Sequence, residues 1–178
     1  MNPSSEKQSN ERLMRRATQA AVLTAILLII IKLVAWSITG SVSILASLVD
    51  SMLDAVVSLI NLLAVRYALT PPDSEHRFGH GKAEPLVGFV QVGFICASAI
   101  FLVLHAVERL RLSMDVQHAE VGIAVMLVAT VITSALVVYQ RYVIRQTRST
   151  VIAADSLHYL TDVLTNISVL AALILSLY

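Results

Sequence analysis

The sequence predicts an all-α fold, a polytopic membrane bundle of five transmembrane helices. Of the 178 residues, 57% are hydrophobic and 14% are charged, whereas an ordinary soluble domain carries roughly 25% charged residues. The mean hydropathy of +0.77 is also high for a soluble protein. The apolar residues form long unbroken stretches rather than the one-sided pattern of a surface helix, and such stretches are typical of membrane spans.

Five apolar stretches each reach the roughly 20 residues that a helix needs to cross the hydrocarbon layer. A tight turn around Gly40 separates the first two, and a loop that opens with Pro71 and Pro72 ends the second. Prolines remove backbone donors and disfavour helix in the preceding residue. We expect residues 1–16 to form a cytoplasmic tail and residues 17–178 a transmembrane domain, with spans at about 17–38, 42–69, 85–107, 121–142 and 151–178.

The distribution of lysine and arginine predicts the orientation, because short cytoplasmic loops are rich in these residues. With the N-terminus inside, ten of the thirteen basic residues fall on the cytoplasmic side. We therefore expect a multi-pass membrane protein with a cytoplasmic N-terminus. The lipid bilayer is the expected partner, and no basic patch with interleaved aromatic residues indicates nucleic acid.

Ionisable side chains inside two of the spans form the candidate site. Asp50 and Asp54 lie four residues apart in the second span, and His158 and Asp162 lie four apart in the fifth. This spacing places each pair on one helix face. A carboxylate at the bilayer centre costs roughly 2.5–3.5 kcal/mol, so such residues usually have a function. Asp54 and Asp162 are expected at the same depth, roughly 16 Å from the cytoplasmic edge, which predicts one site between two antiparallel helices.

The chemistry of these four side chains suits a divalent metal. Three carboxylates and one imidazole can complete the four-coordinate shell of Zn²⁺. Mixed oxygen and nitrogen ligands also suit Fe²⁺, Mn²⁺ or Co²⁺, so the ligands do not identify the metal. Metal and protons compete for the same atoms. We predict exchange of a divalent metal for protons, and the alternative is an interhelical hydrogen-bond cluster of protonated carboxyls.

Three sequence segments carry a resemblance to a known family. They are the second-span pair within Ser47-Leu48-Val49-Asp50 and Asp54, the loop of residues 73–84, and the fifth-span pair within Ala154-Asp155-Ser156-Leu157-His158-Tyr159 and Asp162. The chain resembles the cation diffusion facilitators, in particular the bacterial zinc and ferrous-iron exporter branch.

The resemblance implies a homodimer of the cell inner (cytoplasmic) membrane that exports zinc against proton entry, with ferrous iron, cadmium and manganese as alternative ions. It implies a transport site formed by Asp50, Asp54, His158 and Asp162, and a second metal site in the loop formed by Asp73, His76 and His80. From the residues alone, the loop side chains are either a surface metal site or ordinary solvated residues.

The family pattern has six spans followed by a cytoplasmic metal-binding domain, and this chain has five. The chain is therefore incomplete relative to the family, and we expect a fragment or a naturally short form. The alternatives to efflux are a metal-binding fragment that does not transport and a proton-coupled carrier of another solute. We expect neither an enzyme nor a cofactor, since no H-E-x-x-H motif and no serine–histidine pair in a protease context is present.

Three further polar residues lie within the spans. Lys32 is expected to extend along the first span toward the membrane interface. Asp155 is expected to interact with Arg145 or Arg148, or with the helix dipole at the start of the fifth span. Asn61 is expected to form an interhelical hydrogen bond.

Overall fold

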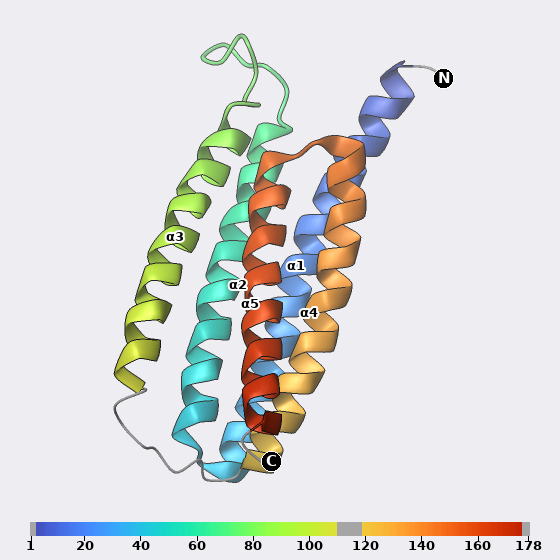
Figure 1. The fold of residues 1–178 in the computed structure, drawn as a ribbon. Coiled ribbons are helices and arrows are strands. Elements are labelled where there is room, and N and C mark those ends of the chain that lie inside the picture. Colours follow the sequence, from blue (N-terminus) through green and yellow to red (C-terminus); the bar gives the residue numbers. More distant parts are fainter. Residues whose placement is uncertain (1–2, 110–118, 176–178) are drawn as a thin grey trace.

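The computed structural model describes residues 3–109 and 119–175 as five helices that run side by side (Figure 1). They are α1 (Pro3–Thr39), α2 (Val42–Ala68), α3 (Ala83–Arg109), α4 (Ala119–Thr147) and α5 (Thr150–Leu175). The prediction of an all-α bundle is confirmed.

Four of the described helices, α1 to α4, are long and apolar enough to cross a membrane. The remaining helix, α5, has 26 residues and carries His158 and Asp162, two of the four ionisable side chains of the candidate site. Its length of about 39 Å suffices to span the hydrocarbon layer, and it lies alongside the others (Figure 1). The chain is a multi-pass membrane protein.

The first helix is longer than expected. It begins at Pro3 rather than near residue 17, so the polar N-terminal segment continues the same helix. Met14 and Ala17 pack into a buried cluster with the end of α2 and the α4–α5 junction, formed by Val65, Val143, Val151 and Ile152. This packing gives the polar segment a buried face, which explains why the helix does not end where the apolar stretch ends.

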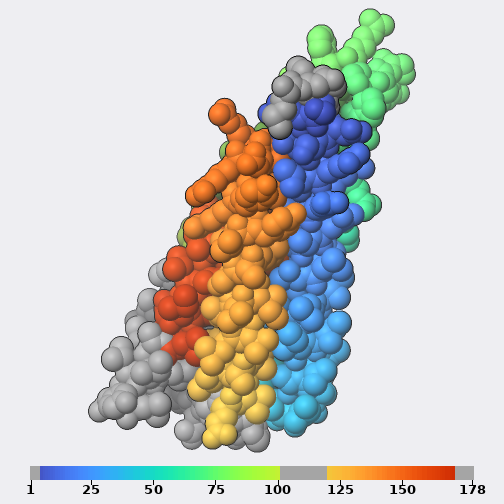
Figure 2. All heavy atoms as spheres, turned by 90° about the vertical axis from the view of Figure 1, so that its right-hand side faces the viewer, coloured from blue at the N-terminus to red at the C-terminus, as the bar shows by residue number. Residues whose placement is uncertain are grey.

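The connections alternate between the two ends of the bundle. The start of α1, the α2–α3 loop and the α4–α5 link lie at one end, and the α1–α2 turn lies at the other (Figure 1). Along the bundle, α1 packs against α2 and α4, while α5 packs against α3, α4 and α2. A second view shows α1 and α4 side by side on one face (Figure 2). The three segments expected on the same side of the membrane therefore lie at the same end.

The α3–α5 contact depends on Gly88, which is buried. A Cβ atom at this position would lie 3.4 Å from the carbonyl carbon and oxygen of Thr150. Small residues allow such a close approach of helix backbones in membranes. The contact brings the start of α5 against α3.

We expect Gly88→Leu to destabilise the fold by about 1–3 kcal/mol, because overpacking a close contact forces backbones apart. Thermal unfolding of the purified chain in detergent measures the loss. Gly93→Leu, on the same helix, is the matched control, because a Cβ there meets nothing within 4 Å. An equal loss of stability in both variants would contradict the proposed close contact.

Candidate metal centre

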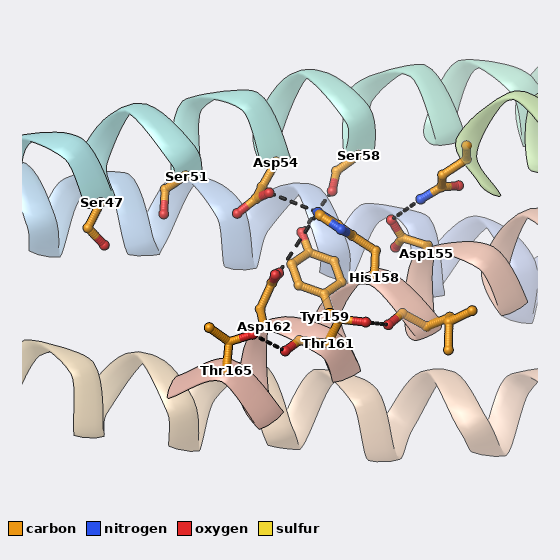
Figure 3. A network of polar contacts seen from close by, with 12 residues as sticks. Ser47, Ser51, Asp54, Ser58, Asp155, His158, Tyr159, Thr161, Asp162 and Thr165 are labelled. Carbon is orange, nitrogen blue, oxygen red and sulfur yellow. Dashed lines mark hydrogen bonds and ion pairs between the residues drawn. The ribbon is translucent and has the colours of Figure 1, made fainter. Parts of the chain in front are cut away.

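Asp54 on α2 and His158 and Asp162 on α5 come together across the two helices (Figure 3). His158 Nε2 lies 2.9 Å from Asp54 Oδ1 and 3.8 Å from Asp162 Oδ2. One ligand atom from each residue lies within 4.8 Å of the others. Because α2 and α5 are antiparallel, residues expected at equal depth do meet. These three residues are called the triad below.

The triad is only partly buried. The side-chain exposed fractions are 12% for His158, 19% for Asp54 and 40% for Asp162. A tetrahedral ion with bonds of about 2.0 Å needs ligand atoms about 3.3 Å apart, and the two distances from His158, 2.9 and 3.8 Å, lie on either side of that value. Two carboxylates around one partly buried imidazole suit the exchange of a cation.

Asp50 lies outside the triad, one turn before Asp54 on α2, and its side chain is exposed. Its carboxylate interacts electrostatically with Asp54 and Lys32. The structure therefore brings three of the four predicted ligands together, and Asp50 as a fourth ligand stays a prediction.

A buried hydrogen bond beside the triad ties the same two helices together. Ser58 Oγ on α2 lies 2.8 Å from the Tyr159 hydroxyl on α5 (Figure 3). Both residues are almost fully buried, and each lies next to a triad residue, one turn after Asp54 and directly after His158. This pair helps to fix the register between α2 and α5. Sequence reasoning missed it, although Ser58 continues the four-residue spacing of the acidic pair.

Lys32 does not extend toward the interface as expected. Its ammonium group reaches across from α1 to α2 and donates to the Ser51 hydroxyl at 2.6 Å and the Ser47 carbonyl oxygen at 3.1 Å. It also interacts electrostatically with Asp54, Asp50 and Asp162. In an isolated helix, extension of the side chain toward the interface would cost less free energy. In the bundle, α2 places oxygen acceptors and carboxylates near the ammonium group.

The expected interaction of Asp155 with Arg145 or Arg148 is also wrong. Asp155 is buried, whereas Arg145 and Arg148 are exposed. Its carboxylate accepts hydrogen bonds from side-chain amides instead, one of them from Asn61 at 2.8 Å. The interhelical hydrogen bond predicted for Asn61 is thereby confirmed.

The loop residues Asp73, His76 and His80 also come together, each offering one ligand atom within 4.8 Å of the others. His76 Nδ1 lies 3.3 Å from Asp73 Oδ1, and His80 Nε2 lies 3.4 Å from Asp73 Oδ2. The His80 side chain is 4% exposed and packs edge-on against the Tyr67 ring. The loop group thus combines one buried histidine, His80, with two exposed residues, Asp73 and His76.

Backbone N–H groups of the loop hold the Asp73 side chain in this arrangement. The N–H groups of His76 and Glu75 donate to Asp73 Oδ1 at 2.6 and 3.0 Å. The His76 hydrogen bond, together with that of Glu75, holds the pKa of the Asp73 carboxyl below its ordinary value of 3.8. The carboxylate is therefore ionised, and ready to bind a cation, at neutral pH.

Comparison with known proteins assigns the chain to a family. Residues 18–178 match the cation efflux transmembrane domain. The chain is 49% identical over 123 residues to the cation-efflux pump FieF of Shewanella oneidensis, which covers 69% of this chain and 42% of that protein. It is 53% identical over 121 residues to FieF of Cronobacter sakazakii, which covers 68% and 40%.

The matched region spans about two fifths of the length of these curated relatives. The match to the domain, by contrast, extends over nearly all of this chain after the first turns of α1. It includes both members of each four-residue pair and the whole loop between α2 and α3. The chain belongs to the cation diffusion facilitator family and carries its cation efflux transmembrane domain.

Proposed function

We propose that the chain provides the membrane pathway of a divalent-cation efflux transporter, with Asp50, Asp54, His158 and Asp162 as the transport site. The observation that carries the proposal is the triad, in which side chains from two antiparallel helices converge inside the bundle. Two similar relatives are named cation-efflux pumps, which supports the same direction of transport.

Zinc is the proposed ion. One imidazole nitrogen and carboxylate oxygens are ligands that Zn²⁺ accepts in a four-coordinate site. Ferrous iron, manganese and cadmium are the alternatives, because the same ligand set suits several divalent metals. The loop residues Asp73, His76 and His80 are proposed as a second metal site, supported by their mutual distances.

Exchange for protons follows from the same ligands. Carboxylates and a neutral imidazole bind metal only when deprotonated, so metal entry releases protons and protonation releases metal. Histidine changes its charge close to neutral pH, which suits such an exchange. The hydrogen bond between His158 and Asp54 supports a site that holds protons between metal-binding events.

For the cellular setting we propose the inner membrane with the N-terminus in the cytoplasm, supported by the basic residues of the segments at one end of the bundle. The start of α1, the end of α2 with the loop after it, and the end of α4 lie there (Figure 1). These segments carry Arg12, Arg15, Arg66, Lys82 and Arg145. A homodimer of the complete protein is the assembly that the family resemblance implies.

The test is zinc flux into lipid vesicles that contain the purified chain and enclose a fluorescent zinc indicator. We expect flux in the wild type and none with Asp54→Ala. Tight zinc binding without any wild-type flux would favour a metal-binding fragment over a transporter. Proton flux that does not depend on metal would favour a proton-coupled carrier of another solute.

A further inference from the structure

A second polar cluster lies deep in the bundle, around Asp155 on α5. The carboxylate accepts hydrogen bonds from Asn61 on α2 at 2.8 Å, Gln91 on α3 at 3.3 Å and Gln140 on α4 at 2.6 Å. All four residues are buried, with exposed fractions between 1% and 4%. The three amide residues are called the amide shell below. Four helices thus converge on one carboxylate that is not part of the triad.

In each residue of the amide shell, the side-chain nitrogen has a hydrogen-bond partner and the carbonyl oxygen has none. The carbonyl oxygens of Asn61, Gln91 and Gln140 are buried and have no hydrogen-bond partner. Among the side chains that the structure describes, those of residues 5–100 and 120–170, the remaining buried atom without a partner is Nδ1 of His80. Each unpaired buried polar group costs about 1–3 kcal/mol. A cluster that only tied helices together would not need three such atoms in one place.

Side-chain amides can serve both charge states of a carboxyl. A half-turn of an amide exchanges its NH₂ donor for its carbonyl acceptor at almost the same atomic positions. The shell can therefore donate to an ionised Asp155 or accept a hydrogen bond from a protonated one. The 2.6 Å distance between Gln140 and Asp155 Oδ2 is short for N–H···O and ordinary for O–H···O.

The groups around Asp155 do not restrict its carboxyl to the ionised form or to the protonated form. The helices α2, α3 and α4 present neutral amides to it. His158 and Tyr159, on α5 itself, are the ionisable groups that interact with it electrostatically among the described residues. Burial favours the neutral carboxyl and the three N–H donors favour the carboxylate. The surroundings thus contribute to both charge states, one through burial and the other through hydrogen bonds.

We propose that Asp155 is a second proton-binding site in the membrane, separate from the triad. Figure 3 shows Asp155 and His158 on successive turns of α5, so a divalent cation beside His158 would repel a proton from Asp155. The role of this proton in exchange rests on the proposed function. Proton binding itself does not, because it needs neither metal nor transport.

Infrared spectroscopy of the metal-free chain in lipid tests the proposal, since a protonated carboxyl absorbs at a frequency distinct from a carboxylate. We expect the wild type to gain a protonated-carboxyl band as the solution is taken from about pH 8 to about pH 4. Asp155→Asn, which keeps the size of the side chain, should remove one component of that band. Identical titrations of the wild type and Asp155→Asn would overturn the proposal.

A second variant keeps the test decisive if Asp155→Asn does not fold. Asn61→Leu removes one donor from the ionised carboxylate, so the protonated band should persist to a pH about one unit higher. Asn166→Leu, an amide on α5 outside the shell, is the matched control and should not change the titration. A titration unaffected by Asn61→Leu would contradict the proposal.

Repeating the titration in sodium chloride and in choline chloride shows whether Asp155 binds a proton or a metal cation. A proton site titrates identically in the two salts. A band that is lost on adding sodium at constant pH would show a metal cation bound to the oxygen atoms, and would overturn a proton site. Because no zinc is used, failure here is separate from failure of the vesicle flux experiment.

Discussion

Asp54→Asn is expected to lower the zinc affinity of the membrane site by about 100-fold or more. Loss of an outer partner of a metal ligand already costs 10- to 100-fold, and Asp54 is proposed to bind the ion directly. The neutral amide also leaves His158 without the carboxylate that lies 2.9 Å from its Nε2. Competition with a chelator of known affinity, on the purified chain in detergent, measures the change.

Two further variants sharpen this measurement. Thr165→Ala removes a side chain one turn beyond Asp162 that bonds within its own helix, to Thr161, and should leave affinity unchanged. Asp50→Asn shows whether Asp50 is a fourth ligand. If it is, this variant should lose as much zinc affinity as Asp54→Asn, and if the site has three ligands the loss should be smaller. Wild-type affinity in Asp54→Asn would refute the triad as the metal centre.

Each bound zinc ion is expected to release protons, so its affinity should rise with pH. Where one ligand must lose one proton, affinity falls about tenfold for each pH unit below the point at which that ligand titrates. The sign follows from competition, because protonation removes the lone pair that binds the metal. Zinc binding measured between about pH 6 and about pH 8, across the ordinary range of histidine, detects the slope.

The number of protons released is measured directly by adding zinc to the chain in weakly buffered solution and following a pH indicator. The double variant His76→Ala with His80→Ala removes two residues of the loop site, so any remaining release belongs to the membrane site. An affinity for zinc that is constant across this pH range would oppose proton exchange.

The helices and their order could be predicted from the sequence because the spans are long and largely apolar, and turn residues mark the ends of the first two. The turn at Gly40 and the break at Pro71 and Pro72 match the ends of α1 and α2. The start of α1 could not be predicted, since the burial of Met14 depends on contacts with distant parts of the chain.

The convergence of the triad could also be predicted, because the four-residue spacing and the matched depth of Asp54 and Asp162 are properties of sequence. The partners of Lys32 and Asp155 could not. They depend on how each helix is rotated about its axis, and apolar sequences that face lipid on one side and helices on the other give little indication of that rotation. Isolated glutamines such as Gln91 and Gln140 carry no spacing that would connect them to Asp155.

The position of Lys32 has a consequence for which ions the pathway favours. Its ammonium group interacts with three carboxylates, those of Asp50, Asp54 and Asp162. When the three carboxylates are ionised, Lys32 is protonated and His158 is neutral, these five side chains together carry a net charge of two negative units. One divalent ion makes this assembly electrically neutral, whereas a monovalent ion leaves a net negative charge and a trivalent ion a net positive one. Since net charge is costly in hydrocarbon, ion valence itself would be a basis for selection at the proposed site.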